Sequence, residues 1–279
     1  MGQLKSFLKK IKLLNATINV YRKYRKWVHG LNISKTIYFN LKFFGFFKGI
    51  KLPVFLYGKV AFGSLSGKIQ IIGPIHTRMI VIGKNCDGFS ERYKSLINIP
   101  GSVIFRGEFM GSCGVTLESI GTLDIGRMVS LGTGAKIRCW NEIKIGSGTG
   151  IVEECQVFDT NFHAVQDVIS GQITNPSGTV RIGEYCWIGN RTTIAKGTIL
   201  PNHTIVASNS LVNKDFTFLG ENLIIAGIPA KKINENKRRV YLELEMNRIF
   251  YNGDRIAFSK NLVSEKQNEE GRYETFKNI

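Results

Sequence analysis

The chain has 279 residues, of which 43% are hydrophobic and 30 are glycine, so it is globular and rich in turns rather than disordered, with length for one large domain or two small ones. Its five cysteines show no paired metal-ligand spacing, and their odd number argues against a closed disulfide framework, which favours a reducing cytoplasm. The net charge of +17 belongs to one segment: residues 1–86 carry sixteen Lys and Arg and no Asp or Glu, whereas the rest holds 22 bases against 21 acids.

The N-terminal sequence predicts neither a signal peptide nor a membrane span. Four lysines interrupt the apolar residues of positions 4–12, so no continuous hydrophobic region forms there. Four more interrupt the richest apolar stretch, residues 36–62. We therefore expect a chain that is soluble or attached peripherally to a membrane.

Residues 4–28 are expected to form a basic amphipathic helix, because apolar residues recur there at helical spacing with Lys and Arg largely on the other face. This helix could pack its apolar stripe on the main domain or on a partner subunit. It could equally lie at an anionic bilayer, where each nearby base adds roughly 1 kcal/mol. Nucleic acid is a weaker hypothesis, since no binding motif accompanies the charge.

An aliphatic residue recurs every six positions in the second half of the chain, at Ile182, Ile188, Ile194, Leu200, Val206 and Val212. A small residue follows four positions after each of the first five, at Cys186, Thr192, Thr198, Thr204 and Ser210. A period of six fits neither a helix nor a lone strand. It predicts short flat segments separated by corners, which is the pattern of a parallel β-solenoid whose coils bury their core against one another.

The same pattern extends towards the N-terminus, with the solenoid expected to begin at Ile69. From Phe105 to Ile125 to Ile145 the step is twenty residues, which is three hexads plus two residues at one corner. Glycines that follow the aliphatic residues suit corners where a Cβ would crowd or a positive φ is needed. Cys155 and Cys186 occupy the column of small residues, and we expect them to be reduced and buried.

Residues 158–179 abandon the period and are expected to protrude from the coil as a loop, which is where function tends to lie in solenoids. The pattern ends after Asp215, and a short helix is expected at Leu242–Phe250. The predicted organisation is a basic segment at 1–60, a β-helix domain at 61–234 and a C-terminal helix and tail at 235–279.

His163 is the candidate catalytic residue, because it stands where the coil gives way to the loop and imidazole can take a proton from an alcohol or amine at neutral pH. Asp159 is close enough in sequence to orient the ring or to bind a substrate hydroxyl. The alternative is a surface histidine with no role. His29, His76 and His203 fit no site that the sequence suggests.

Three motifs at 182–190, 206–215 and 226–233 carry a resemblance when they are taken with the loop histidine. They read IGEYCWIGN, VASNSLVNKD and AGIPAKKI. In this order they resemble the C-terminal half of the hexapeptide-repeat acyltransferases, which include the maltose, galactoside and serine O-acetyltransferases and the sugar acetyltransferases of polysaccharide biosynthesis. The resemblance covers roughly residues 69–234. It implies an all-β, left-handed parallel β-helix that forms a homotrimer and binds acetyl-CoA in a groove between adjacent coils, with the histidine loop over the thioester.

The resemblance also implies roles for individual residues. His163 corresponds to the general base, and no metal or covalent enzyme intermediate is required. The positions that correspond to coenzyme A contacts are Asn190, Ser208, Asn213, Lys214 and Lys231. The lysines would meet the anionic groups of the cofactor as point charges, although solvated surface lysines are the alternative.

The residues before the loop depart from the family pattern. Sugar acetyltransferases carry a carboxylate there for the acceptor sugar, whereas this chain has RCWNE at 138–142, with Glu142 slightly displaced. Trp140 and Asn141 stand near the expected position of the acid, and the indole face could stack on a sugar ring or cover a corner of the coil.

These observations favour an acetyl-CoA-dependent O-acetyltransferase acting on a sugar or a lipid-linked glycan precursor in the cytoplasm, with residues 1–60 near an anionic membrane. The alternatives are an N-acetyltransferase of an amino sugar and a non-catalytic scaffold. A trimeric metalloenzyme of the γ-carbonic anhydrase type is disfavoured, because the histidines lack the paired spacing it would need. The sequence leaves open the acceptor and the acyl chain length.

Overall fold

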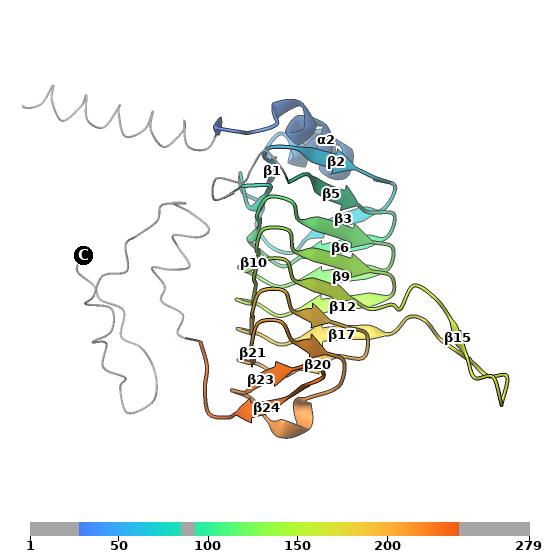
Figure 1. Ribbon diagram of the computed structural model, residues 1–279. Coiled ribbons are helices and arrows are strands. Elements are labelled where there is room, and N and C mark those ends of the chain that lie inside the picture. The colour runs from blue at the N-terminus through green and yellow to red at the C-terminus, as the bar shows by residue number, and fades with distance from the viewer. Residues whose placement is uncertain (1–27, 85–92, 240–279) are drawn as a thin grey trace, which may run out of the picture.

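The computed structural model describes residues 28–84 and 93–239. They form a column with three sheet-lined sides, with helix α2 (Ile33–Gly49) across one end and a hairpin projecting from one side (Figure 1). The expected short helix at Leu242–Phe250 lies outside the described residues, as does the expected helix at 4–28 apart from its last residue.

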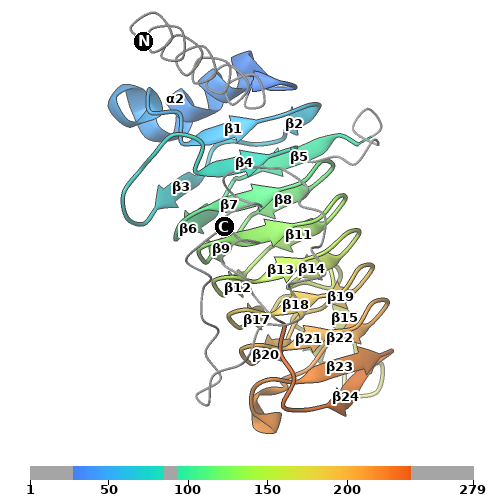
Figure 2. The same cartoon turned by 90° about the vertical axis from the view of Figure 1, so that its left-hand side faces the viewer.

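Three sheets line the column (Figure 2), and their strands are parallel except for the last strand, β24 (Ala230–Asn234). We name them the first, second and third faces. The first face comprises β1 (Val54–Leu56), β4 (Ile80–Ile82), β7 (Phe109–Gly111), β10 (Val129–Leu131), β13 (Gly150–Ile151), β18 (Trp187–Ile188), β21 (Ile205–Val206), β23 (Ile224–Gly227) and β24 (Ala230–Asn234). The second comprises β2 (Val60–Phe62), β5 (Ser95–Asn98), β8 (Thr116–Ser119), β11 (Lys136–Cys139), β14 (Gln156–Phe158), β19 (Thr193–Ile194) and β22 (Leu211–Val212). The third comprises β3 (Lys68–Ile71), β6 (Ser102–Phe105), β9 (Thr122–Ile125), β12 (Glu142–Ile145), β17 (Thr179–Ile182) and β20 (Ile199–Leu200).

The chain is a parallel β-helix, as the hexads predict, and it is left-handed, as the family resemblance implies, against the usual right-handed crossover. Phe105 pairs with Ile125 and Ile125 with Ile145, which confirms the twenty-residue coil. After the hairpin the step falls to eighteen, from Ile182 to Leu200, which is three hexads with no extra residue. The first coil is earlier than expected, since β1 already pairs with β4, so stacking begins at Val54 and not at Ile69.

The two six-residue columns lie inside. All six aliphatic residues of the first column are at most 3% exposed, and so are the small residues four positions after them. The hydroxyls of the small column satisfy corner carbonyls: Thr192 donates to Ala207 at 3.1 Å and Thr204 to Pro201 at 2.7 Å. A threonine therefore suits these positions because it fills a small space and pairs a buried carbonyl.

Glycines at the corners are required by crowding between coils. A Cβ on Gly146 would lie 2.4 Å from the carbonyl carbon of Gly183, and one on Gly183 would lie 2.7 Å from the amide nitrogen of Asn202. Neither glycine has a positive φ. Of the two reasons the sequence suggested, close approach of stacked corners is the one that applies to both.

Helix α2 closes the N-terminal end of the column, where β1 would otherwise leave an unpaired edge. Asn40 is fully buried, and its amide nitrogen donates to the carbonyl of Val54 at 2.7 Å while its oxygen accepts from the Val54 amide at 3.0 Å. Thr36 accepts from the Leu56 amide through its hydroxyl at 3.1 Å. Two side chains of the helix thus replace the neighbouring strand that the first coil lacks.

The C-terminal end is closed differently. Strand β23 continues the first face, and β24 folds back antiparallel to it as the last strand. Phe216 and Leu223 are buried beneath this turn. Both ends of the solenoid are therefore covered, as stacked repeats require for solubility.

Cys139, Cys155 and Cys186 are free and buried, as predicted for the last two. Burial raises the pKa of all three thiols, that of Cys186 to about 12. Such thiols stay protonated and unreactive. Cys113 differs from the sequence-based expectation of no disulfide framework, because it is disulfide-bonded.

Replacing Asn40 by alanine should destabilise the fold by about 2–4 kcal/mol, because it leaves the buried amide and carbonyl of Val54 without partners. Chemical or thermal denaturation followed by circular dichroism would measure the change. Gln70→Ala on the exposed part of β3 is the control and should have little effect. Equal stability of the two variants would show that α2 does not support the first coil.

Candidate active site

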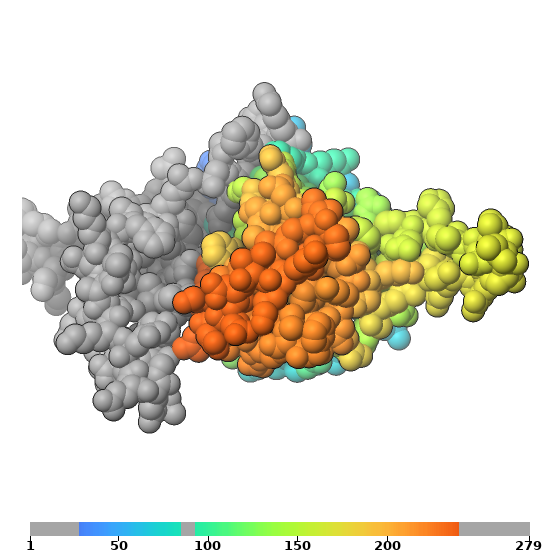
Figure 3. Space-filling view, turned by 60° about the horizontal axis from the view of Figure 1, so that its bottom comes forward, coloured from blue at the N-terminus to red at the C-terminus, as the bar shows by residue number. Residues whose placement is uncertain are grey.

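The expected loop is a two-stranded ribbon that leaves the coil at the corner between the second and third faces. It departs after β14 and returns at β17, and its strands β15 (Val165–Gln166) and β16 (Ile173–Thr174) pair antiparallel. Figure 3 shows the ribbon extending well beyond the outline of the column. Its apolar tip is fully in solvent, with Val168 at 94% and Ile169 at 95% exposure.

Asp159 fastens the root of this ribbon to the preceding coil. Its carboxylate is fully buried and accepts the amide hydrogens of Trp140 and Asn141, each at 2.8 Å. The Asn141 side chain donates in turn to the carbonyl of Gly178 at 2.7 Å, on the returning strand. Asp159 thus anchors the ribbon, and its burial leaves no exposed carboxylate surface for the substrate hydroxyl suggested by the sequence.

An aromatic cluster holds the residue before the histidine. The Phe162 ring meets Trp140 edge-on at 5.5 Å and Phe158 at 6.0 Å, and the Arg138 guanidinium lies 5.8 Å from its centre. Phe162 has a φ of 62°, an unusual conformation for a bulky residue. These contacts fix the direction in which the chain presents His163.

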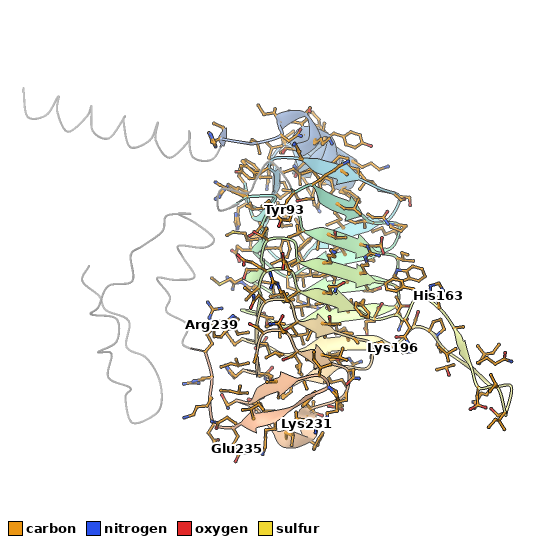
Figure 4. All side chains as sticks on the ribbon, viewed as in Figure 1. Tyr93, His163, Lys196, Lys231, Glu235 and Arg239 are labelled. Carbon is orange, nitrogen blue, oxygen red and sulfur yellow. The ribbon has the colours of Figure 1, made fainter. Side chains whose placement is uncertain are left out.

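His163 is exposed at the root of the ribbon (Figure 4). Among the described residues, none forms a hydrogen bond or ion pair with its imidazole. An imidazole that is free on both nitrogens and held on a braced stem can accept a proton from a bound hydroxyl. This is the chemistry that the sequence suggested for it.

Glu118 is the residue near this site that the sequence analysis missed. Its two carboxylate oxygens accept from the Trp140 indole nitrogen at 3.3 Å and from the Asn98 amide at 3.2 Å. Asn98, Glu118 and Arg138 occupy the same register on β5, β8 and β11. The signal was available in the twenty-residue step, since Glu118 stands one coil before Arg138 on the same outward column.

Glu142, the displaced acid of the sequence motif, belongs to the third face. It pairs with Lys144 at 2.9 Å and Arg181 at 3.6 Å. Its pKa is lowered, chiefly by the hydrogen bond from Lys144. The carboxylate beside Trp140 is therefore that of Glu118, on the neighbouring strand of the preceding coil, rather than that of Glu142, which is adjacent in sequence.

Three polar residues continue the ribbon's corner in the later coils. Lys196 donates to the carbonyl of Asn175 at 2.8 Å and so braces the returning strand, a contact the sequence did not suggest. Asn213 and Lys214 lie exposed one coil further on, and the Lys214 ammonium stands 5.2 Å from the Phe216 ring. Lys196 and Lys214 thus put two positive charges on the corner that carries His163.

The other expected coenzyme A contacts lie elsewhere on the chain. Asn190 and Ser208 are stacked at the corner between the first and second faces, where their side chains hydrogen-bond to each other. Lys231 is exposed on β24 at the C-terminal end (Figure 4). One chain therefore brings together His163, Trp140, Asn141 and Asp159, but it does not bring Asn190, Ser208 or Lys231 to them.

The described residues contain no group of three or more His, Cys, Asp or Glu side chains placed to hold a metal ion. The polar groups of the site are instead an exposed imidazole, a braced indole and lysines. These suit the binding of a polar organic molecule and the movement of a proton.

Comparison with known proteins gives one informative relative. The chain is 29% identical over 154 residues to WbbJ of Escherichia coli (strain K12), which is provisionally named as a lipopolysaccharide biosynthesis O-acetyl transferase; the match covers 52% of this chain and 77% of WbbJ. The hexapeptide coil and the histidine ribbon agree with this match, and together they support a relationship to the hexapeptide-repeat acyltransferases. No protein-family model matches it.

Two solved structures resemble this chain distantly. The polysialic-acid-specific acetyltransferase NeuO aligns with 18% identity and a TM-score of 0.42, covering 67% of this chain and 90% of NeuO. The polysialic acid O-acetyltransferase OatWY aligns with 24% identity and the same score, covering 67% of this chain and 92% of OatWY.

Replacing Asp159 by alanine should destabilise the protein by about 2–4 kcal/mol, because two backbone amides lose a charged acceptor that is buried. Asp167 is a matched control: its exposed carboxylate also accepts two backbone amides, of Ile169 and Ser170, which lower its pKa. Asp167→Ala should leave the thermal midpoint nearly unchanged. Similar losses in both variants would contradict the anchoring role.

Proposed function

We propose that this protein is an acetyl-CoA-dependent O-acetyltransferase acting on a sugar or glycan precursor, with His163 as general base. The observation that supports this most is the exposed imidazole on a stem braced by Asp159 and the Phe162 cluster. The similarity to WbbJ supports oxygen as the acylated atom and a polysaccharide precursor as the acceptor.

In the proposed reaction, acetyl-CoA supplies the thioester carbonyl. His163 takes the proton of the acceptor hydroxyl as that oxygen forms a bond to the carbonyl carbon. The backbone amide near Asn190 donates to the oxyanion that develops. The carbon–sulfur bond then breaks, and His163 returns the proton to the thiolate of coenzyme A. This thiolate is a good leaving group without further catalysis, because the pKa of its thiol is near 8.5 by analogy with cysteine.

The proposed acceptor site lies beside His163. Trp140 is 40% exposed and offers an aromatic surface on which a sugar ring can stack. Glu118 holds the indole by its ring nitrogen, and Arg138 stands next to it on the second face. The hydroxyl to be acylated would then point towards the imidazole.

The proposed coenzyme A contacts require more than one chain. Asn190 and Ser208 lie at one corner of the column, whereas His163, Asn213 and Lys214 lie at another. A homotrimer in which the first corner of one subunit faces the ribbon corner of its neighbour would bring the two sets together. The cofactor would then lie between subunits, with Lys214 and Lys231 near its anionic groups.

His163→Ala should lower kcat by about 10²–10⁴-fold, the usual contribution of a general base. Binding of acetyl-CoA, read as a rise of the thermal midpoint, should survive in the variant, since the imidazole is not among the proposed cofactor contacts. His76→Ala, an exposed histidine outside the site, is the control. Undiminished acetyl transfer by His163→Ala would refute the proposed mechanism. A wild-type protein whose thermal midpoint does not rise with acetyl-CoA would instead favour a non-catalytic scaffold.

Mixing two inactive variants tests whether the site is shared between chains. His163→Ala removes the base, and Ser208→Trp should block the corner that carries Asn190 and Ser208, because Ser208 is exposed and its position tolerates a larger side chain. Each homotrimer should be inactive, whereas co-expressed chains should regain part of the activity in mixed trimers that join an intact ribbon to an intact corner. A mass of one 31.3 kDa chain in light scattering, or no recovery, would contradict the shared site.

A further inference from the structure

The N-terminal end of the column exposes an unusual amount of apolar surface. Helix α2 turns Thr36, Phe39 and Asn40 towards the first coil, where they are buried. Beside this buried face, large apolar residues remain in solvent along the helix and just after it: Ile33 at 61%, Ile37 at 44%, Leu41 at 41%, Phe46 at 68%, Phe47 at 85% and Ile50 at 58% exposure. We name Phe46, Phe47 and Ile50, with Lys42, Lys48 and Lys51, the end patch.

The shape of the backbone puts the two phenylalanines outside. Gly45 interrupts the helix with a φ of 65° and a ψ of −174°. This left-handed conformation suits glycine and redirects the chain after it. The rings of Phe46 and Phe47 contact each other edge-on at 5.9 Å, yet both stay in solvent. Neighbouring aromatic rings exposed at the end of a helix are costly in water and suggest that something covers them.

The charge around the end patch is of one sign. Lys42, Lys48 and Lys51 are exposed, and the whole sequence from 1 to 86 contains no Asp or Glu. A second copy of this end would bring like charges together. Residues 1–27 would do the same, because they carry eight Lys and Arg and no acid. The occupant that complements the patch is therefore anionic and has an apolar layer.

We propose that the end patch docks this protein on an anionic lipid bilayer. Phe46, Phe47 and Ile50 enter the boundary between headgroups and acyl chains, and the three lysines meet the lipid phosphates. The contact is peripheral: no helix of the described residues is both long and apolar enough to cross a membrane. Within residues 1–60, the end patch is thus the surface that contacts the membrane. Its binding to lipid does not depend on the proposed acetyl transfer.

Docking at this end would set the height of the acceptor site. Between β2 and β14 the second face has four strand steps, each about 4.8 Å, so the ribbon root stands about 19 Å beyond the first coil. If the proposed trimer forms about an axis along the column, its three end patches face the same side and bind together. Such a site would face the glycan part of a lipid-carried precursor rather than its lipid anchor.

Flotation of the full chain with vesicles tests the proposal. We expect binding to phosphatidylcholine vesicles that contain phosphatidylglycerol, weaker binding to pure phosphatidylcholine, and loss of binding as salt is raised. Phe46→Ser with Phe47→Ser should weaken binding by about tenfold or more. The matched control is Val168→Ser with Ile169→Ser at the ribbon tip, which removes two still more exposed apolar residues and should change nothing.

The contribution of the lysines to vesicle binding is tested by a second pair of variants. Lys48→Gln with Lys51→Gln should weaken binding by about tenfold or more at low salt, whereas Lys68→Gln with Lys136→Gln, on the exposed column sides, should have little effect.

The proposal would be overturned if the Phe46→Ser, Phe47→Ser variant bound vesicles as well as the wild type does. It would also be overturned if the wild type bound no vesicles. If the wild type formed a larger assembly in solution and only this variant did not, the end patch would instead be a contact with a second copy of the chain. Acetyl transfer to a soluble acceptor, measured in parallel, keeps failure of the docking surface distinct from failure of the proposed activity.

Discussion

The structure depends on the pairing of each coil with the next. In the parallel faces, the backbone donors and acceptors of one strand are met by the strand one coil on, so the chain must return to the same register after every turn. Residues beyond the length of one coil cannot be inserted within a strand without breaking its hydrogen bonds to the strands of both neighbouring coils. They must leave at a corner, and the ribbon between β14 and β17 does so without altering the pairing of Ile145 with Ile182.

A protruding ribbon needs an anchor, because its own two short strands bury almost nothing. The anchor is polar: the buried carboxylate of Asp159 takes two amides of the previous corner, and Lys196 holds the returning strand. A second set of contacts supports the residue before His163: the Trp140 indole donates to Glu118 and packs edge-on against Phe162. The site is thus rigid where the proposed chemistry needs direction, and free at the imidazole itself.

The sequence predicts the regular part of this fold well, because a strict period of six has few structural solutions. It predicts the ends poorly, because α2 closes the first coil through Thr36 and Asn40, whose roles follow from where the helix lies rather than from any repeat. The same holds for the site. The position of His163 at the root of the ribbon follows from the sequence, whereas the place of Glu118 beside Trp140 becomes apparent only when coils are aligned, and the burial of Asp159 depends on a corner nineteen residues earlier.

The division of the site residues between two corners follows from the same geometry. A column with three faces points its corners in different directions, so the proposed contacts at Asn190 and Ser208 lie on a different corner from His163. A solenoid gains a shared cleft by placing copies side by side, which leaves every coil and both closed ends unchanged. Cyclic assembly also turns all N-terminal ends the same way. The number of coils between α2 and the ribbon then becomes a spacer, and a longer or shorter coil stack would raise or lower the proposed acceptor site over a surface bound at that end.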